Sequence, residues 1–94
     1  MYNNKMNIDY DPIKSLSNKE KHGIALEEAV LIEWETLLSI TDNRVDYGEP
    51  RQIGYAVMNN RLYCIVFTDR GDTRRVISLR KANSREVKLY AEHT

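Results

Sequence analysis

Two kinds of hydrophobic pattern occupy the first part of the chain. Residues 6–11, MNIDYD, alternate apolar and polar side chains, which predicts a short strand. Pro12 suits the first turn of a helix because its missing N–H would have no partner there, and this helix is expected to continue over residues 13–22. Gly23 then supplies the left-handed conformation that ends it. A second helix is predicted over residues 26–38, LEEAVLIEWETLL, because its apolar side chains recur at three- and four-residue spacing.

The hydrophobic period changes to two after residue 50. RQIGYAVM (51–58) and RLYCIVFT (61–68) alternate as strands do. The connection between them is Asn59-Asn60, a pair that tolerates the positive φ angles of a type I′ hairpin. A second turn around residues 69–72 leads into another strand, TRRVISLRK (73–81). These segments predict a three-stranded antiparallel meander.

A polar loop and a short final helix complete the pattern. Residues 41–51 are polar and contain glycine and proline, which predicts a loop. Asn83 or Ser84 can cap a helix over residues 84–93, and the spacing from Asn83 to Glu86 is that of a capping box. The predicted order is strand, helix, helix, three-stranded meander, helix, which is an α+β fold in one domain over residues 1–94.

The predicted meander has two different faces. If both of its loops have an even number of residues, the aliphatic face should pack against the helices, and it carries Ile53, Tyr55, Val57, Leu62, Cys64, Val66, Ile77 and Leu79. The other face mixes small, aromatic and cationic side chains and is expected to be a binding surface, with Gln52, Gly54, Ala56, Tyr63, Phe67, Arg74, Val76, Ser78 and Arg80. An odd-numbered second loop would turn the last strand over.

Composition narrows the class of protein. Hydrophobic residues make up 41% of the 94 and charged residues 30%, which is an ordinary globular balance. No apolar run approaches the ~20 residues that a membrane-spanning helix needs, and the N-terminus lacks the pattern of a signal peptide. The one cysteine, Cys64, cannot form an internal disulfide. We therefore expect a cytoplasmic protein.

The overall charge hides a strong asymmetry along the chain. The 14 Lys and Arg balance the 14 Asp and Glu, but the acids predominate in residues 1–50 and the cations in residues 51–94. The segment RGDTRRVISLRKANSREVK, residues 70–88, gathers the cations Arg70, Arg74, Arg75, Arg80, Lys81, Arg85 and Lys88. Such a segment favours a surface for a polyanion or an acidic partner. Alternatively, the two halves neutralise each other by packing together.

Five sequence motifs carry a family resemblance. They are DYDPIKSLSNKEKHG (9–23), LEEA (26–29), DYGEPR (46–51), IGYAVMNNRLYCIVFTDRG (53–71) and RVISLRKANSREVKLY (75–90). Taken in this order, they resemble the BrnT family of small type II toxins, which belong to the RelE-like ribonuclease superfamily. Leu26 stands where the family usually has an aromatic residue.

The resemblance implies a RelE-like fold and an RNA-cleaving toxin, blocked by an antitoxin encoded beside it. Antitoxins of this family resemble ribbon-helix-helix DNA-binding proteins, which implies that the pair represses its own promoter. On this hypothesis the BrnA-like antitoxin covers the basic face of the sheet. The alternative is a non-catalytic member that binds such a partner and acts only as a co-repressor.

Metal-independent RNA cleavage needs three kinds of group. The substrate's 2′-OH is the nucleophile, so the enzyme supplies a base for its proton, an acid for the leaving 5′-oxygen and cations for the phosphate. Arg80 is the first candidate for stabilising the phosphate, with Arg75, Arg51 and Lys81 in support. His22 is the candidate general base. Glu86 and Tyr90 are candidates for proton transfer. The expected RNA-binding residues are Arg51, Arg74, Lys81, Arg85 and Tyr63. We expect no metal or other cofactor, because no histidine or cysteine has metal-ligand spacing.

Several of these residues also fit a structural role. His22 suits the end of a helix, where a cation is favourable. Arg75 could tie the sheet to an acid of the second predicted helix, and Glu86 could serve only the capping box. Tyr90 could be a packed anchor, and Tyr63 could belong to the packing of the sheet. The sequence leaves both interpretations open.

Overall fold

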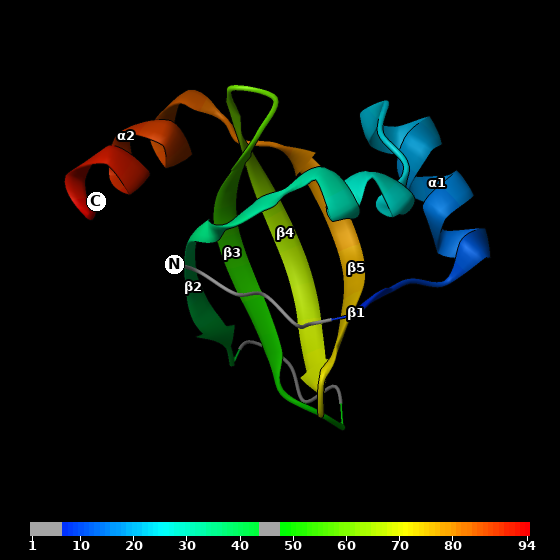
Figure 1. Cartoon of the computed structure of the whole chain (residues 1–94). Helices are drawn as coiled ribbons and strands as arrows, with labels where there is room; N and C mark the ends of the chain where they lie inside the picture. The colour runs from blue at the N-terminus through cyan, green and yellow to red at the C-terminus, as the bar shows by residue number, and fades with distance from the viewer. Residues whose placement is uncertain (1–6, 44–47) are drawn as a thin grey trace.

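One mixed five-stranded sheet forms the centre of the fold. The computed structural model describes residues 7–43 and 48–94. The strand order is β1-β5-β4-β3-β2, with β1 parallel to β5 and the other neighbours antiparallel. The helices α1 and α2 lie at opposite sides of the sheet (Figure 1). In chain order the elements are β1 (Asn7–Asp9), α1 (Pro12–His22), the 3-10 helix η1 (Leu26–Leu31), β2 (Glu33–Asp42), β3 (Arg51–Met58), β4 (Arg61–Arg70), β5 (Thr73–Lys81) and α2 (Ser84–Glu92).

Local signals in the sequence predicted most of these elements. The first helix, the three strands of the meander and the final helix are confirmed. Asn59 and Asn60 have φ angles of 53° and 60°, as a type I′ hairpin requires. Gly23 ends α1 with φ 76°. The predicted strand over residues 6–11 is confirmed in β1, although Met6 lies outside the described residues. The middle of the predicted loop, residues 44–47, also lies outside the described residues.

The second predicted helix is wrong beyond residue 31. Ile32 has extended backbone angles (φ −67°, ψ 136°) and ends η1, and β2 begins at the next residue. Ile32 and Trp34 are buried while Glu33 and Glu35 are exposed, so burial here follows a period of two. The same apolar residues fit a helical spacing, but only a strand can extend the sheet beyond β3. The α+β class holds, with five strands in place of the predicted four.

The predicted faces of the meander are inverted over β3, β4 and the first part of β5, whereas Ser78, Leu79 and Arg80 point to the sides that were predicted. The face expected to bind a ligand is the core face, because the chain from Ile24 to Trp34 packs on it. The buried cluster comprises Ile24, Leu26, Ala29, Ile32, Trp34, Ala56, Met58, Tyr63, Ile65, Phe67, Val76 and Leu79. Gly54 lets Leu37 and Phe67 pack closely on this face, since a Cβ there would lie 2.5 Å from Leu37 Cδ1 and 3.2 Å from Phe67 Cε1.

A β-bulge in β5 breaks the alternation that the prediction assumed. Val66 pairs with Ser78 but Phe67 pairs with Val76, so Ile77 is an extra residue in the strand. Val76 and Leu79 are therefore both in the core, although they are an odd number of residues apart. The opposite face carries Ser78 on β5 and, two residues later, Arg80.

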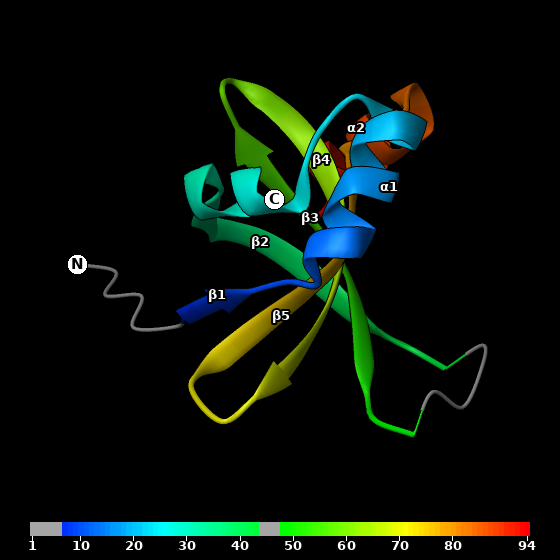
Figure 2. The same ribbon diagram turned by 90° about the vertical axis from the view of Figure 1, so that its right-hand side faces the viewer.

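The side chain of Asn18 joins α1 to the outer edge of β5. β1 pairs only with Thr73–Arg75 of that edge, and α1 lies against the rest of it (Figures 1 and 2). Asn18 Nδ2 donates to Leu79 O at 2.8 Å, and Asn18 Oδ1 accepts from Leu79 N at 3.2 Å. The amide therefore pairs with the strand as a backbone unit would. It also donates to Ile24 O at 2.7 Å.

We predict that Asn18→Leu strongly destabilises the fold. The substitution leaves three buried backbone groups without partners, and each such group costs about 1–3 kcal/mol. The free energy of unfolding, measured by urea denaturation, should fall by about 3 kcal/mol or more. Ser17→Ala is the matched control, because the neighbouring Ser17 is exposed. An unchanged urea midpoint for Asn18→Leu would contradict the assigned role of the amide.

Candidate active site

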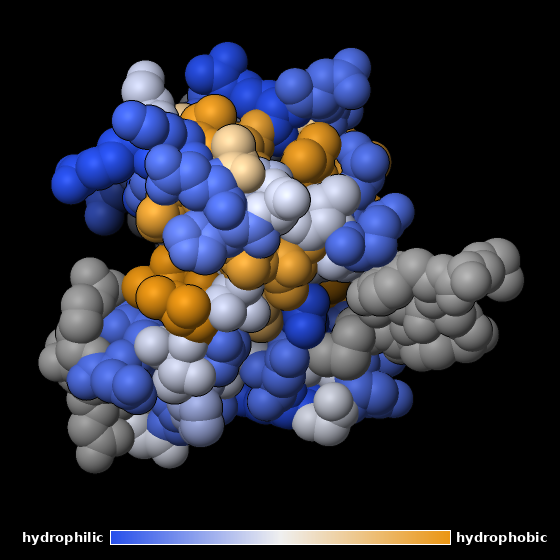
Figure 3. Space-filling view, turned by 90° about the vertical axis from the view of Figure 1, so that its left-hand side faces the viewer, coloured by the Kyte–Doolittle hydropathy of each residue, from blue (hydrophilic) through white to orange (hydrophobic). Residues whose placement is uncertain are grey.

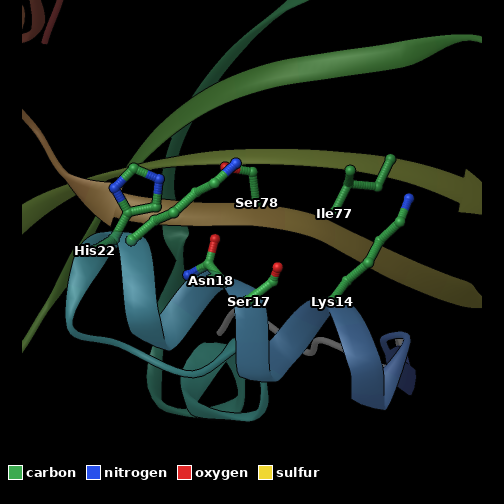
Figure 4. Close-up of a pocket in the computed structure, with 7 residues that line it drawn as sticks. Lys14, Ser17, Asn18, His22, Ile77 and Ser78 are labelled. Carbon is green, nitrogen blue, oxygen red and sulfur yellow. The ribbon is translucent and has the colours of Figure 1, made fainter.

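A cleft of about 300 Å³ lies between α1 and β5. Its lining residues are Lys14, Ser17, Asn18, Lys21 and His22 from α1, and Ile77 and Ser78 from β5. The α1 residues share one helix face because they recur at three- and four-residue spacing. In Figure 4, Lys14, Ser17, Asn18 and His22 project from α1 toward the strand that carries Ile77 and Ser78.

Two lysines and one histidine, Lys14, Lys21 and His22, are the basic side chains that line the cleft. Lys14, Lys21 and His22 are exposed, and within the described residues none of them has an ion-pair or side-chain hydrogen-bond partner. Asn18, by contrast, is buried and committed to the backbone of Leu79. The cleft can therefore receive an anion such as a phosphate beside an imidazole.

Arg80 lies farther along the same strand, beyond the residues that line the cleft. It follows Ser78 by two residues and projects from the same face of β5. Its two terminal nitrogens donate to Glu86 Oε1 and Oε2 of α2, both at 2.8 Å. Tyr55 Oη also donates to Glu86 Oε2, at 3.2 Å. This paired, two-point geometry is the one in which a guanidinium binds a carboxylate or a phosphate.

Glu86 has two structural duties in this cluster. Its Oε1 accepts the backbone N–H of Asn83 at 2.9 Å, and Asn83 Oδ1 accepts the N–H of Glu86 at 2.9 Å. The predicted capping box of the last helix is thus confirmed. The same carboxylate that caps α2 also holds Arg80.

The ion pair sets the protonation states of the cluster. The Arg80 hydrogen bonds lower the pKa of Glu86 from 4.5 to about 2, against the opposing effect of burial. The same contact raises the pKa of Arg80. Burial, with the nearby negative groups, raises the pKa of Tyr55 to about 12. A carboxylate with so low a pKa is a weak base and is not protonated at neutral pH, so the geometry favours the capping role of Glu86 over proton transfer.

The two arginines at the start of β5 are engaged in structural contacts. Arg75 forms an ion pair with Asp9 of β1 rather than with the predicted second helix. Arg74 binds Asp69 at 2.8 and 3.0 Å, and its guanidinium lies 4.4 Å from the centre of the Phe67 ring. Both side chains hold the sheet together in this conformation.

The structure separates the remaining candidates from the cleft. Tyr63 is 7% exposed and belongs to the core, so its ring has no face open to a base. Tyr90 Oη donates to Thr36 O at 2.5 Å, which anchors α2 to β2. Arg51 pairs with Asp42 in the β2–β3 register, at the end of β3 away from Tyr55. Lys81 and Arg85 are exposed near Arg80, at the end of β5 and the start of α2.

Sequence reasoning missed part of the site. Lys14, Ser17 and Lys21 share a helix face with His22, and this spacing was visible in the sequence. Ser78 was predicted on the binding face and does line the cleft, but the bulge at Ile77, which separates it from the core residue Val76, was not visible in the sequence. Tyr55 was expected in the core, whereas it contacts Glu86.

Two absences concern the described residues only. Within residues 7–43 and 48–94, no three histidine, cysteine, aspartate or glutamate side chains lie together as metal ligands would. In the same part of the chain, no helix has the length and apolar character needed to cross a bilayer.

Comparisons with known proteins give a family and a fold. Residues 10–86 match the family model described as "Ribonuclease toxin, BrnT, of type II toxin-antitoxin system". Among solved structures, the crystal structure of the Brucella abortus ribonuclease toxin BrnT is similar, with a TM-score of 0.66 and 22% sequence identity. The match covers 84% of this chain and 99% of that one. No curated protein sequence matches the chain.

The Glu86–Arg80 pair predicts a pH dependence of stability. The pKa of Glu86 is lower in the folded state than its usual 4.5, so the folded state binds its proton less readily. The stabilisation is therefore complete above pH 4.5 and is lost as the pH falls toward 2. Because 35% of the Arg80 side chain is exposed, solvent screening reduces the loss to about 1–2 kcal/mol.

Urea denaturation between pH 7 and pH 2.5 measures this contribution. Glu86→Gln should be less stable than the wild type at pH 7, and the difference should shrink at pH 2.5. Glu20→Gln, at an exposed position of α1, serves as the control. A constant difference between wild type and Glu86→Gln at all pH values would refute the coupling.

Proposed function

Because the chain belongs to the BrnT family of ribonuclease toxins from type II toxin-antitoxin systems, we propose that it is a cytoplasmic ribonuclease that cuts RNA to inhibit translation and is neutralised by a cognate antitoxin. The observation that carries the proposal is the α1–β5 cleft, where His22 and two lysines line a cavity beside the strand that bears Arg80. Phosphate binding needs such cations, and proton transfer from the 2′-OH needs a base such as the His22 imidazole.

The cleft supplies the groups for cleavage through the substrate's own 2′-OH, without a metal. His22 takes the proton of the 2′-OH, whose oxygen attacks the adjacent phosphorus, and the bond from phosphorus to the 5′-oxygen breaks. Lys14 and Lys21 carry the ammonium groups that offset the charge on the phosphate oxygens and can protonate the leaving 5′-oxygen.

Arg80 is the second phosphate ligand in this proposal, and Glu86 competes for it. The carboxylate occupies the Nη1–Nη2 edge of the guanidinium, so a phosphate that binds this edge must displace it. α2 has no fully buried residue, which makes its movement away from β5 less costly. Lys81 and Arg85 are close enough in the chain to bind neighbouring phosphates of the RNA.

The proposal also includes the type of fold and the type of antitoxin that the family resemblance implies. The fold is taken as RelE-like, and the antitoxin as a BrnA-like ribbon-helix-helix protein that directs the pair to operator DNA. The alternative function is a non-catalytic co-repressor. One observation favours it: in this conformation Glu86 neutralises Arg80.

We predict that Arg80→Ala lowers the rate of RNA cleavage by about 10²-fold or more, because one aligned charge donor to the phosphate is lost. Cleavage of bulk RNA by the purified proteins is the measurement, with circular dichroism to confirm folding. Arg70→Ala is the matched control, since Arg70 also pairs with a glutamate but at the opposite end of the sheet. Equal losses in the two variants would argue against a site at Arg80.

His22→Gln should lower the cleavage rate by about 10²–10⁴-fold, the usual contribution of a general base. The dependence of the cleavage rate on pH should also change in the variant, because the proposed base is lost. A pH profile of the rate measures both effects. If His22 only ends the helix, the variant will keep the wild-type profile.

Expression of the chain without any partner separates the two functions. Growth arrest and RNA loss that are both relieved by Arg80→Ala support the ribonuclease. A folded wild-type protein that harms neither growth nor RNA would favour the co-repressor.

A further inference from the structure

The α1–β5 cleft has basic side chains at two separate places along its length. Lys14 and His22 lie in the first and last turns of α1, which puts them about 12 Å apart along the helix axis. In Figure 4, Lys14 extends beside Ile77 and away from His22. Lys21 directly precedes His22 in the last turn. A phosphate bound at His22 therefore leaves the ammonium group of Lys14 for a second anion.

No acidic side chain offsets these charges within the described lining of the cleft. The lining residues that are not basic are Ser17, Asn18, Ile77 and Ser78. The amide of Asn18 lies between the two lysines along the helix, and it is hydrogen-bonded to the backbone of Leu79. It holds α1 on the strand and so keeps the two basic ends at a fixed separation. Both ends attract anions.

A second cavity, of about 200 Å³ between α2 and the β2 side of the sheet, has a different character. It is lined by leucine, isoleucine and tyrosine side chains together with His93. Figure 3 shows an apolar patch on the side of the molecule that carries α2 and β2. Its lining contains no lysine or arginine. A polyanion therefore finds matching charge in the α1–β5 cleft and not in this cavity.

We propose that the α1–β5 cleft binds two consecutive phosphates of a single RNA strand. The scissile phosphate lies at His22 and Lys21, and the neighbouring phosphate lies at Lys14. The half-buried Ile77 then contacts the sugar between them. A basic groove that follows the backbone suits a single strand, and a cavity of about 300 Å³ is far too small for a double helix. This inference rests on the proposed function, because it takes His22 to be the base that fixes the scissile phosphate.

The second phosphate makes Lys14 a residue that selects the length of the substrate. In a dinucleotide the phosphate that joins the two nucleosides is the one that is cut, so the position at Lys14 stays empty. A trinucleotide fills it. Binding energy gained away from the reacting atoms raises kcat/KM when it aligns the scissile phosphate with the base. Trinucleotides should therefore be cut more efficiently than dinucleotides.

The test compares a dinucleotide with two trinucleotides that carry the extra phosphate on the 5′ or the 3′ side of the cut. Each substrate has one ribonucleotide among deoxynucleotides, so cleavage through the 2′-OH occurs at one place. For one of the two trinucleotides, Lys14→Ala should lower the trinucleotide-to-dinucleotide ratio of kcat/KM by about 10-fold, the effect of losing one charge-assisted hydrogen bond.

Two further lysines of the same helix serve as comparisons. Lys21→Ala should slow cleavage of all three substrates and leave the ratio as in the wild type, because it acts on the scissile phosphate. Lys19→Ala is the matched control, since Lys19 is exposed on α1 and does not line the cleft. It should cut all three substrates as the wild type does.

A binding measurement keeps this inference apart from the ribonuclease proposal. The 2′-O-methyl forms of the oligonucleotides cannot be cut, and NMR titration at several salt concentrations gives their affinities. For the trinucleotide, Lys14→Ala should reduce the slope of log affinity against log salt concentration by about 0.7, the value for one phosphate of a single strand. The change should be smaller for the dinucleotide. A chain that shows this difference but cuts no RNA would support the two-phosphate cleft and refute the ribonuclease.

Three results would overturn the position assigned to Lys14. Equal losses on the dinucleotide and both trinucleotides in Lys14→Ala would place Lys14 at the scissile phosphate. Identical behaviour of Lys14→Ala and Lys19→Ala would show that neither lysine contacts the strand. Absence of binding of the 2′-O-methyl trinucleotides by the wild type would remove the site altogether. In the first two cases a wild-type chain that cuts RNA leaves the ribonuclease proposal standing.

Discussion

The outer edge of β5 must find hydrogen-bond partners, and the way it does so determines where the candidate site lies. β1 pairs with the first three residues of the strand, and the amide of Asn18 pairs with Leu79 farther along. A buried strand edge without such partners would cost several kcal/mol. Because Asn18 belongs to α1, satisfying this edge also sets the helix face that carries Lys14, Lys21 and His22 against β5. The cleft is thus a consequence of edge pairing.

The carboxylate of Glu86 is a second constraint on the structure, because it forms contacts in both α2 and β5. It closes the capping box of α2 and binds Arg80 of β5. Releasing Arg80 to a phosphate therefore weakens the first turn of α2, and stabilising α2 keeps Arg80 occupied. The position of this lightly buried helix and the charge offered to a substrate are linked in one equilibrium.

Local signals predicted the parts of the fold that local physics determines. The Asn59-Asn60 turn, the Gly23 stop and the Asn83–Glu86 capping box each depend on neighbours within a few residues. The errors came from contacts distant in sequence. Ile32 and Trp34 fit either a helix or a strand until the pairing of β2 with β3 decides, and the bulge at Ile77 follows from the register of β4 and β5. His22 and Arg80 were identified as candidates from residue type, but the bond of Asn18 to a strand 61 residues away could not be predicted.

The sequence suggested that the clustered positive charge either binds a polyanion or acidic partner, or neutralises the acidic half by packing. The structure shows that different basic residues have different roles. Within the described residues, ion pairs join the acidic and basic parts of the chain, among them Arg70 with Glu49 and Arg75 with Asp9, so part of the clustered positive charge serves packing. Arg74 and Arg80 pair with acids in their own half. The cations that line the α1–β5 cleft, Lys14 and Lys21, come from the acidic half. Folding therefore redistributes the charge, and the surface suited to a phosphate is built where a helix of one half meets a strand of the other.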